Sequence, residues 1–278
     1  MKYTRNEFLK LTGLGITSAA ILPAAGAISN APAHKEEKFR LGLASYTFKS
    51  FSLDDTIKWS KQLGLNYISL KDSHMPLQTS DEDLKKIAEK IKAAGLTLYG
   101  AGVIYMKTPE EVDNAFRYAK AAGLEMIIGV PNHELLPQVN ELVKKHDIKL
   151  AIHNHGPGDK LYTSPSDVYD KVKDLDQRIG LCIDVGHVVR IGLDPAVMIS
   201  RYKDRLLDMH MKDEDKNVAE GKPLEIGHGV IDIPKIIKTL KKIGYAGVVG
   251  FEYEKDMDAP LAGLAESVGY VRGVMKMT

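Results

Sequence analysis

The sequence predicts an α/β fold, a closed (β/α)8 barrel that forms a single domain over residues 39–278. Short apolar runs alternate with amphipathic segments, a pattern typical of parallel strands joined by helices. There are eight apolar runs in about 240 residues, and this number fits a closed barrel better than an open α/β sheet, which is the alternative. No G-x-G-x-x-G motif follows the first run, so a dinucleotide-binding sheet is not supported.

The expected strands are the apolar runs themselves, each of which leads into a polar loop. They span residues 40–48, 65–72, 96–104, 125–132, 148–155, 179–187, 206–213 and 247–254. Helical patterns lie between them at 81–95, 108–123, 134–147, 164–176 and 233–244. Three of these follow a Ser, Thr or Asp that can cap the first turn. Glycine suits the left-handed position after a helix, and it recurs at Gly64, Gly95, Gly123 and Gly244.

The first 33 residues have the pattern of a secretory signal peptide. A short basic head, MKYTRNEFLK, precedes the apolar run LTGLGITSAAILPAAGAI, and Ala31-Pro32-Ala33 offers a small-residue cleavage site. An uncleaved membrane anchor is the alternative, but the run is short and rich in Gly and Ala for a spanning helix. We therefore expect an exported, periplasmic protein with no stable membrane insertion after cleavage.

Charge and cysteine content exclude some classes of partner. The formal net charge is +1, so no broad basic field would attract nucleic acid. The one cysteine, Cys182, can form no intrachain disulfide and is expected to be a small core residue. The sequence leaves a homo-oligomer open.

Histidines gather at the ends of the expected strands, where barrels of this class carry their functional groups. Seven of the nine lie there, and only His34 and His146 do not. Scattered structural histidines would fall anywhere along the chain, so the clustering indicates a site.

Four consecutive strands, the fifth to the eighth, each end in a residue that can bind a metal ion. These residues are His153, Asp184, His210 and Glu252. Two imidazoles and two carboxylates suit one divalent ion, and neighbouring strand ends can meet at one point, so we predict a metal site. The alternatives are structural: Asp184 could cap the next helix, and Glu252 could pair with a lysine such as Lys212.

The motifs LGLASYTF, LCIDVGH, LLDMHMKD and IGHGVIDIPKIIKTLKKIGYAGVVGFEYE together resemble the xylose isomerase-like TIM barrels of the sugar phosphate isomerase/epimerase type. The resemblance covers residues 39–278. It implies one divalent ion, often manganese, held by Glu, Asp, His and Glu on strands five to eight. Asp184, His210 and Glu252 match this set, but His153 stands where the family has the first Glu.

This departure changes the expected chemistry. The two family glutamates also form the acid/base pair, and here one carboxylate is missing. A +2 ion among two carboxylates is about neutralised, so it should polarise a bound oxygen more strongly. The additional nitrogen shifts the preference toward zinc, cobalt or nickel, although manganese still fits.

The remaining candidate residues lie around the same strand ends. The expected proton carriers are Glu252, which would also ligate, and His155, His187, Lys71 and Lys212. Strand-end lysines near a cation should have lowered pKa values, which suits acid/base work; ion pairs with Asp72 or Asp213 are the alternative. The expected substrate-binding residues are Tyr46, Phe48, Tyr105, Glu254 and His228. The aromatic rings of Tyr46, Phe48 and Tyr105 could stack on a sugar or belong to the core.

Together these features predict a metal-dependent isomerase or epimerase that acts on a small carbohydrate through an enediol. Because sugar phosphates are kept inside cells, export favours an unphosphorylated substrate. A metal-dependent lyase or hydrolase of an oxidised (3-keto) glycoside is the first alternative, and the missing glutamate fits it. A non-catalytic, secreted sugar-binding protein is the second.

Overall fold

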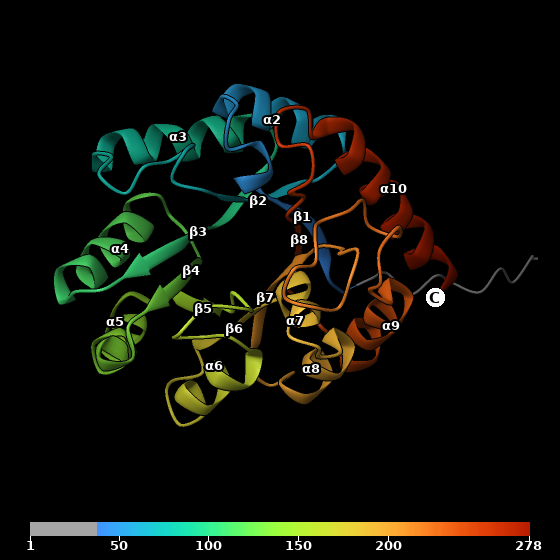
Figure 1. Cartoon of the computed structure of the whole chain (residues 1–278). Helices are drawn as coiled ribbons and strands as arrows, with labels where there is room; N and C mark the ends of the chain where they lie inside the picture. Colours follow the sequence, from blue (N-terminus) through green and yellow to red (C-terminus); the bar gives the residue numbers. More distant parts are fainter. Residues whose placement is uncertain (1–37) are drawn as a thin grey trace, which may run out of the picture. The chain divides into compact units, whose positions relative to one another are not determined.

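The computed structural model describes residues 38–278, so the expected signal peptide at 1–33 lies outside the described residues. Eight parallel strands close into a barrel in chain order, from β1 to β8, with β8 pairing back onto β1. Figure 1 shows the helices as an outer ring around this barrel. The expected closed (β/α)8 fold is confirmed, and the open sheet is ruled out.

The strands coincide with the predicted apolar runs and are shorter, except that β3 extends two residues beyond its run. They are β1 Arg40–Ala44, β2 Tyr67–Leu70, β3 Thr97–Met106, β4 Met126–Pro131, β5 Lys149–His153, β6 Ile179–Asp184, β7 Leu206–Met211 and β8 Val248–Phe251. The helices are α2 Leu53–Gln62, α3 Asp81–Ala93, α4 Pro109–Ala121, α5 Leu136–His146, α6 Pro165–Val172, α7 Val185–Arg190, α8 Pro195–Arg201, α9 Ile233–Ile243 and α10 Leu261–Met277. Short 3-10 helices lie at Ser45–Phe48 and His133–Leu135.

The helices begin and end where the local chemistry predicts. Hydroxyl side chains of Ser80, Thr108 and Ser164 accept first-turn N–H bonds at the starts of α3, α4 and α6. Glycines follow α2, α3, α4 and α9 with φ of +65°, +82°, +66° and +70°, the left-handed region that a residue with Cβ rarely adopts. Local sequence therefore sets the period of the strand–helix units.

Apolar side chains fill two layers, one between the strands and the helices and a smaller one inside the barrel. The strands β4 and β6 are buried along their whole length, as expected for a parallel sheet covered by helices. The inner layer contains Tyr99, Ile128 and Cys182, which confirms Cys182 as a core residue.

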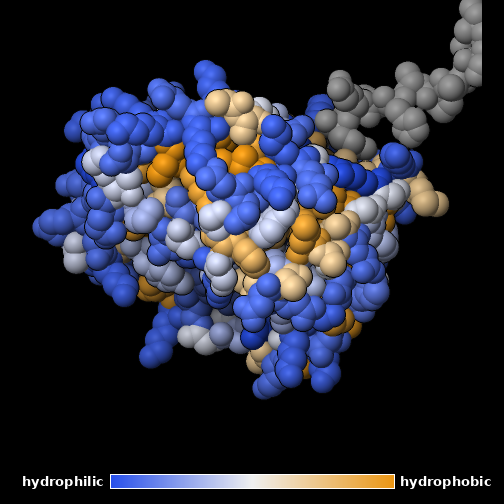
Figure 2. Space-filling model, turned by 90° about the horizontal axis from the view of Figure 1, so that it is seen from above, coloured by the Kyte–Doolittle hydropathy of each residue, from blue (hydrophilic) through white to orange (hydrophobic). Residues whose placement is uncertain are grey.

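The outer surface is mainly hydrophilic on the face that Figure 2 shows, with small hydrophobic patches between charged side chains. Among residues 38–278, no helix has the length and apolar character needed to span a bilayer.

Gly180 of β6 offers a test of the packing around the sheet. A Cβ at this position would lie 2.2 Å from the carbonyl oxygen of Arg205 and 2.8 Å from Cγ of Leu207. We expect Gly180→Ala to lower the free energy of unfolding by about 1–3 kcal/mol, because the backbone must shift. Chemical denaturation measures this change.

Gly273 in α10 is the matched control. It is exposed, and no atom lies within 4 Å of a Cβ built there. Gly273→Ala should raise the free energy of unfolding by about 0.5–1 kcal/mol, because alanine loses less backbone entropy in a helix. Equal stability of the two variants would contradict this account of the packing.

Candidate metal centre and active site

The carboxyl ends of β5 to β8 bring four predicted metal ligands to one point. His153 ends β5, Asp184 ends β6, His210 lies near the end of β7, and Glu252 follows β8. One ligand atom from each lies within 4.8 Å of all the others. Neighbouring strands of a parallel barrel end on the same rim, which explains why residues 99 positions apart in the chain converge.

The contacts identify the atoms that face the centre. His153 Nε2 lies 3.2 Å from His210 Nδ1 and 3.5 Å from Asp184 Oδ2. His210 Nδ1 lies 3.1 Å from Glu252 Oε2. All four side chains are almost fully buried.

Asp184 uses its two carboxylate oxygens for different tasks. Oδ1 accepts the backbone N–H of His187 at 2.9 Å and so caps α7, whereas Oδ2 faces the centre, 3.5 Å from His153 Nε2. The predicted structural alternative is therefore also present, without excluding a metal role. Asn154 also fixes the position of Asp184, because its Oδ1 accepts the backbone N–H of Asp184 at 3.1 Å.

The pKa values of the two histidines of the cluster are shifted in opposite directions. Burial lowers the pKa of His153 to about 3, so its ring is neutral at neutral pH. Burial also acts on His210, but the charge and hydrogen bond of Glu252 outweigh it and raise the pKa of His210 to about 9.

Lys212 lies against the same oxygens. Its Nζ is 3.0 Å from Asp184 Oδ2 and 2.8 Å from Glu252 Oε2, and it also contacts Glu254. Burial alone would lower the pKa of Lys212, but the three carboxylates raise it well above its usual value. The lowered pKa expected from the sequence is thus wrong for this lysine, and its partners are not Asp213 but residues of the site.

The charges fit a divalent cation. Burial alone would raise the pKa of Asp184 and Glu252, but the Lys212 ammonium holds both well below the usual range. With Glu254 the site then carries three negative charges, against the Lys212 ammonium and, below a pH of about 9, the His210 imidazolium. Once a metal ion displaces the His210 proton, the deficit is two positive charges. Two imidazole nitrogens and two carboxylate oxygens facing one point could hold zinc, cobalt or manganese.

A pocket of about 280 Å³ opens next to this cluster. It is lined by Tyr46, Lys71, Val103, Tyr105, His153, His155, His187, Lys212, Glu252 and Glu254. Most of the residues predicted for proton transfer and substrate contact therefore share one pocket with two of the ligand candidates. Burial lowers the pKa of His187 to about 4, so this ring is neutral as well.

His155 links two walls of the pocket. Its Nε2 lies 3.0 Å from the Tyr105 hydroxyl, and its Nδ1 lies 3.5 Å from Asp159 Oδ2. The Lys71 ammonium lies 5.8 Å from the centre of the Tyr46 ring. It is 3.8 Å from Asp72, which is the ion pair named as the alternative to a catalytic role.

Two predicted substrate-binding residues do not reach the pocket. Phe48 is fully buried and packs on Phe51 and Trp59, because the strand ends at Ala44 and a 3-10 helix turns its ring into the core. His228 is exposed and lies 2.6 Å from Glu266 of α10. These two assignments are therefore corrected.

The GHG turn around His228 stabilises its own loop and does not line the pocket. The N–H groups of Gly227 and Gly229 donate to Asp213, at 2.8 and 3.0 Å. Of the seven strand-end histidines, His74 and His133 are also structural. His74 is buried and bonded to Ser45, and His133 lies 3.1 Å from the carbonyl oxygen of Leu161.

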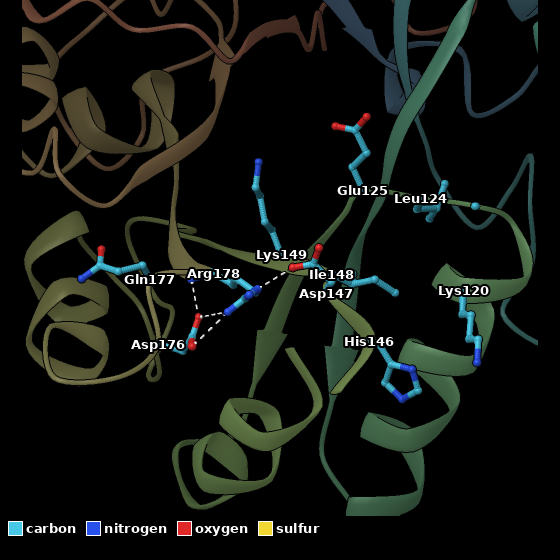
Figure 3. A pocket seen from close by; sticks show the side chains of 11 residues that line it. Lys120, Leu124, Glu125, His146, Asp147, Ile148, Lys149, Asp176, Gln177 and Arg178 are labelled. Carbon is cyan, nitrogen blue, oxygen red and sulfur yellow. Dashed lines mark hydrogen bonds and ion pairs between the residues drawn. The ribbon is translucent and has the colours of Figure 1, made fainter. Parts of the chain in front are cut away.

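A second, larger hollow of about 800 Å³ lies at the opposite end of the barrel, near the starts of β4, β5 and β6 (Figure 3). Its Arg178 bonds to Asp147 and Asp176, as the dashed lines in Figure 3 show. The charged groups there neutralise one another at the surface. The smaller pocket carries the buried titratable groups and is the candidate site.

Sequence reasoning missed three buried polar residues near the cluster, namely Asn154, Asp208 and Glu214. Burial raises the pKa of Asp208 to about 6 and that of Glu214 to about 7. A signal existed for Asp208, because residues two apart on a strand share a side and His210 had already been singled out.

The chain belongs to the xylose isomerase-like TIM barrel family, because the sequence model of that family matches residues 57–274. It is 30% identical over 140 residues to an inosose dehydratase of Clostridium perfringens, a match that covers 44% of this chain and 46% of that protein. The matched segment thus spans less than half the length of this relative.

Solved structures share the fold. A protein of unassigned function from Parabacteroides distasonis has 25% identity and a TM-score of 0.68, covering 85% of this chain and 99% of that one. The IolI protein with a bound zinc atom has 16% identity and a TM-score of 0.71, covering 86% and 99%. At 16% identity, the similarity to the IolI protein concerns the fold alone.

The first prediction for the site concerns metal stoichiometry. Purified protein reconstituted with zinc should hold about one ion per chain, measured by elemental analysis after gel filtration. His153→Ala and Asp184→Ala should each abolish this occupancy, because each removes one of four converging donors. His133→Ala, outside the cluster, is the control and should keep the ion. Full occupancy in both site variants would refute the ligand set.

The second concerns pH. A ligand imidazole must be neutral, so zinc has to displace the proton that His210 holds below its pKa of about 9. His153, with a pKa of about 3, has no proton to release. Zinc affinity should therefore fall as pH falls, about tenfold per unit between pH 8 and 6 for this single proton. Calorimetry in buffers of different ionisation enthalpy measures the number released, and a value of zero would contradict the argument.

Proposed function

We propose that the protein is a divalent-metal-dependent enzyme that acts on a carbohydrate or polyol bearing a carbonyl group. Its first step removes the proton from the carbon next to that carbonyl. The family, the inosose dehydratase relative and the four-donor cluster beside a pocket support this proposal. A bound divalent cation would polarise the carbonyl and stabilise the charge that develops on its oxygen.

The acid and the base of this reaction lie on the same side of the pocket. Lys212 follows β7 and Glu254 follows β8, and the Lys212 ammonium contacts the Glu254 carboxylate. The raised pKa keeps Lys212 protonated, which makes it the acid. Glu254 is less buried than Asp184 and Glu252, so its carboxylate is the more accessible base.

A neighbouring acid and base favour β-elimination. Glu254 takes the proton from the carbon next to the carbonyl, the electron pair forms a carbon–carbon double bond, and the bond to the leaving oxygen breaks. Lys212 gives its proton to that oxygen. The contact between Lys212 and Glu254 carries this proposal: the enzyme is a lyase that acts on a keto sugar, such as a 3-keto glycoside.

Isomerisation or epimerisation is the second candidate. These reactions begin, like the elimination, with removal of the proton next to the carbonyl. Epimerisation, however, requires a proton carrier on each face of that carbon. His153 replaces the carboxylate that would serve the other face, and a buried neutral imidazole is a weak acceptor. The observation that favours this candidate is the hydrogen bond between Tyr105 and His155, which places a second pair of proton carriers on the β3 and β5 side.

We further propose that the protein is exported and that its substrate is unphosphorylated. The basic head, the apolar run and the Ala31-Pro32-Ala33 signal support export. A small pocket lined by two carboxyl and two phenol groups as well as two lysines suits a neutral, hydroxyl-rich molecule.

The zinc-loaded protein should convert p-nitrophenyl 3-keto-glucoside to p-nitrophenol and an unsaturated keto sugar. Nuclear magnetic resonance in deuterated water separates the outcomes. A lyase releases the aglycone with an unsaturated sugar, a hydrolase releases it with a saturated sugar, and an isomerase takes up deuterium while the aglycone stays attached. A sugar-binding protein gives no turnover.

Glu254→Gln and Lys212→Met should each lower kcat by about 10²- to 10⁴-fold, the usual contribution of a general acid or base. Glu89→Gln, an exposed change on α3, is the control and should leave the rate unchanged. Full activity in either site variant would remove that residue from the mechanism.

A further inference from the structure

His210 presents its two ring nitrogens to opposite sides. Nδ1 faces the candidate metal centre, 3.2 Å from His153 Nε2 and 3.1 Å from Glu252 Oε2. Nε2 points into the interior of the barrel, where it is buried and makes no hydrogen bond. An imidazole that binds a metal ion through one nitrogen carries its proton on the other, so the surroundings of Nε2 matter for the site.

Asp208 lies beneath this nitrogen. It precedes His210 by two residues on β7, and its side chain lies on the same side of the strand, inside the barrel. Asp208 Oδ2 is 4.0 Å from His210 Nε2, and the Asp208 side chain is completely buried. A carboxylate rarely occupies such a position unless a charged or donating group faces it.

The neighbours of Asp208 hold it in this orientation. The Cys182 thiol donates to Oδ2 at 3.7 Å, and the Tyr99 hydroxyl donates to Oδ1 at 3.5 Å. These are long, weak contacts, and they satisfy the carboxylate only in part. The backbone N–H of Met209 also bonds to this carboxylate, and the ring of His210 lies on the side of Oδ2.

We propose that Asp208 is a positioning residue for the metal centre, keeping the proton of His210 on Nε2 and leaving Nδ1 free to bind the ion. Even at 4.0 Å a negative charge in the barrel interior favours the tautomer whose N–H faces it. It also makes Nδ1 a stronger donor, as carboxylates behind metal-binding histidines do. This inference rests on the proposed metal site.

The test compares zinc affinity in two variants of the full chain. Asp208→Asn keeps the shape of the side chain and removes its charge, and its amide can donate to Nε2, which would place the proton on Nδ1. We expect zinc binding, measured by chelator competition, to weaken about 10- to 100-fold. Tyr245→Phe, the control, removes a buried hydroxyl that donates only to the carbonyl oxygens of Leu207 and Val248, and it should leave the affinity unchanged. Equal zinc affinity in Asp208→Asn and wild type would overturn the proposal.

A second measurement does not depend on the folding of a variant. Wild-type protein labelled with nitrogen-15 histidine and loaded with cadmium-113 should show coupling between the metal and Nδ1 of His210, with Nε2 protonated. Coupling to Nε2, or an unprotonated Nε2, would overturn the role of Asp208. Absence of any metal binding by the wild type would instead refute the proposed metal centre itself, so the two failures are distinguishable.

Discussion

The site depends on one electrostatic constraint, namely that Asp184 and Glu252 are buried as carboxylates at the rim of the barrel. Such groups are stable only beside positive charge and hydrogen-bond donors. Lys212 supplies one charge, and its ammonium contacts Asp184, Glu252 and Glu254 together. The remaining negative charge attracts a cation to the point that His153 and His210 also face. The proposed metal binding, the protonation of Lys212 and the proposed acid/base pair all follow from this one arrangement.

The same residues join the site to the stability of the fold. Asp184 caps α7 with one oxygen and offers the other to the centre, and Asn154 ties the backbone of β5 to that of β6. Asp213, next to Lys212, gathers backbone N–H groups from the loop before α9, including that of Ile231. Substitutions at these positions, and at Lys212, therefore affect folding and function together, whereas the less buried Glu254 is expected to affect mainly the proposed chemistry.

The strands and helices could be predicted because their signals are local: apolar runs, capping residues and glycines lie next to the segments that they define. The convergence of His153, Asp184, His210 and Glu252 could also be predicted, since parallel strands end on one rim, although their role as ligands stays a prediction. The family resemblance added the expectation of a carboxylate at His153, and the absence of that carboxylate directs the proposed reaction toward elimination.

The sequence by itself thus determined the number of strand–helix units, the barrel and the rim that carries the chemistry, because these depend on contacts between near neighbours and on strand direction. Only the tertiary structure decided which strand-end side chains enter the pocket. Phe48 turns into the core after a short strand, and His228 pairs with α10. The interior distances that set the partners of Lys212 and bring Asp208 beneath His210 arise from barrel closure, and no local pattern contains them.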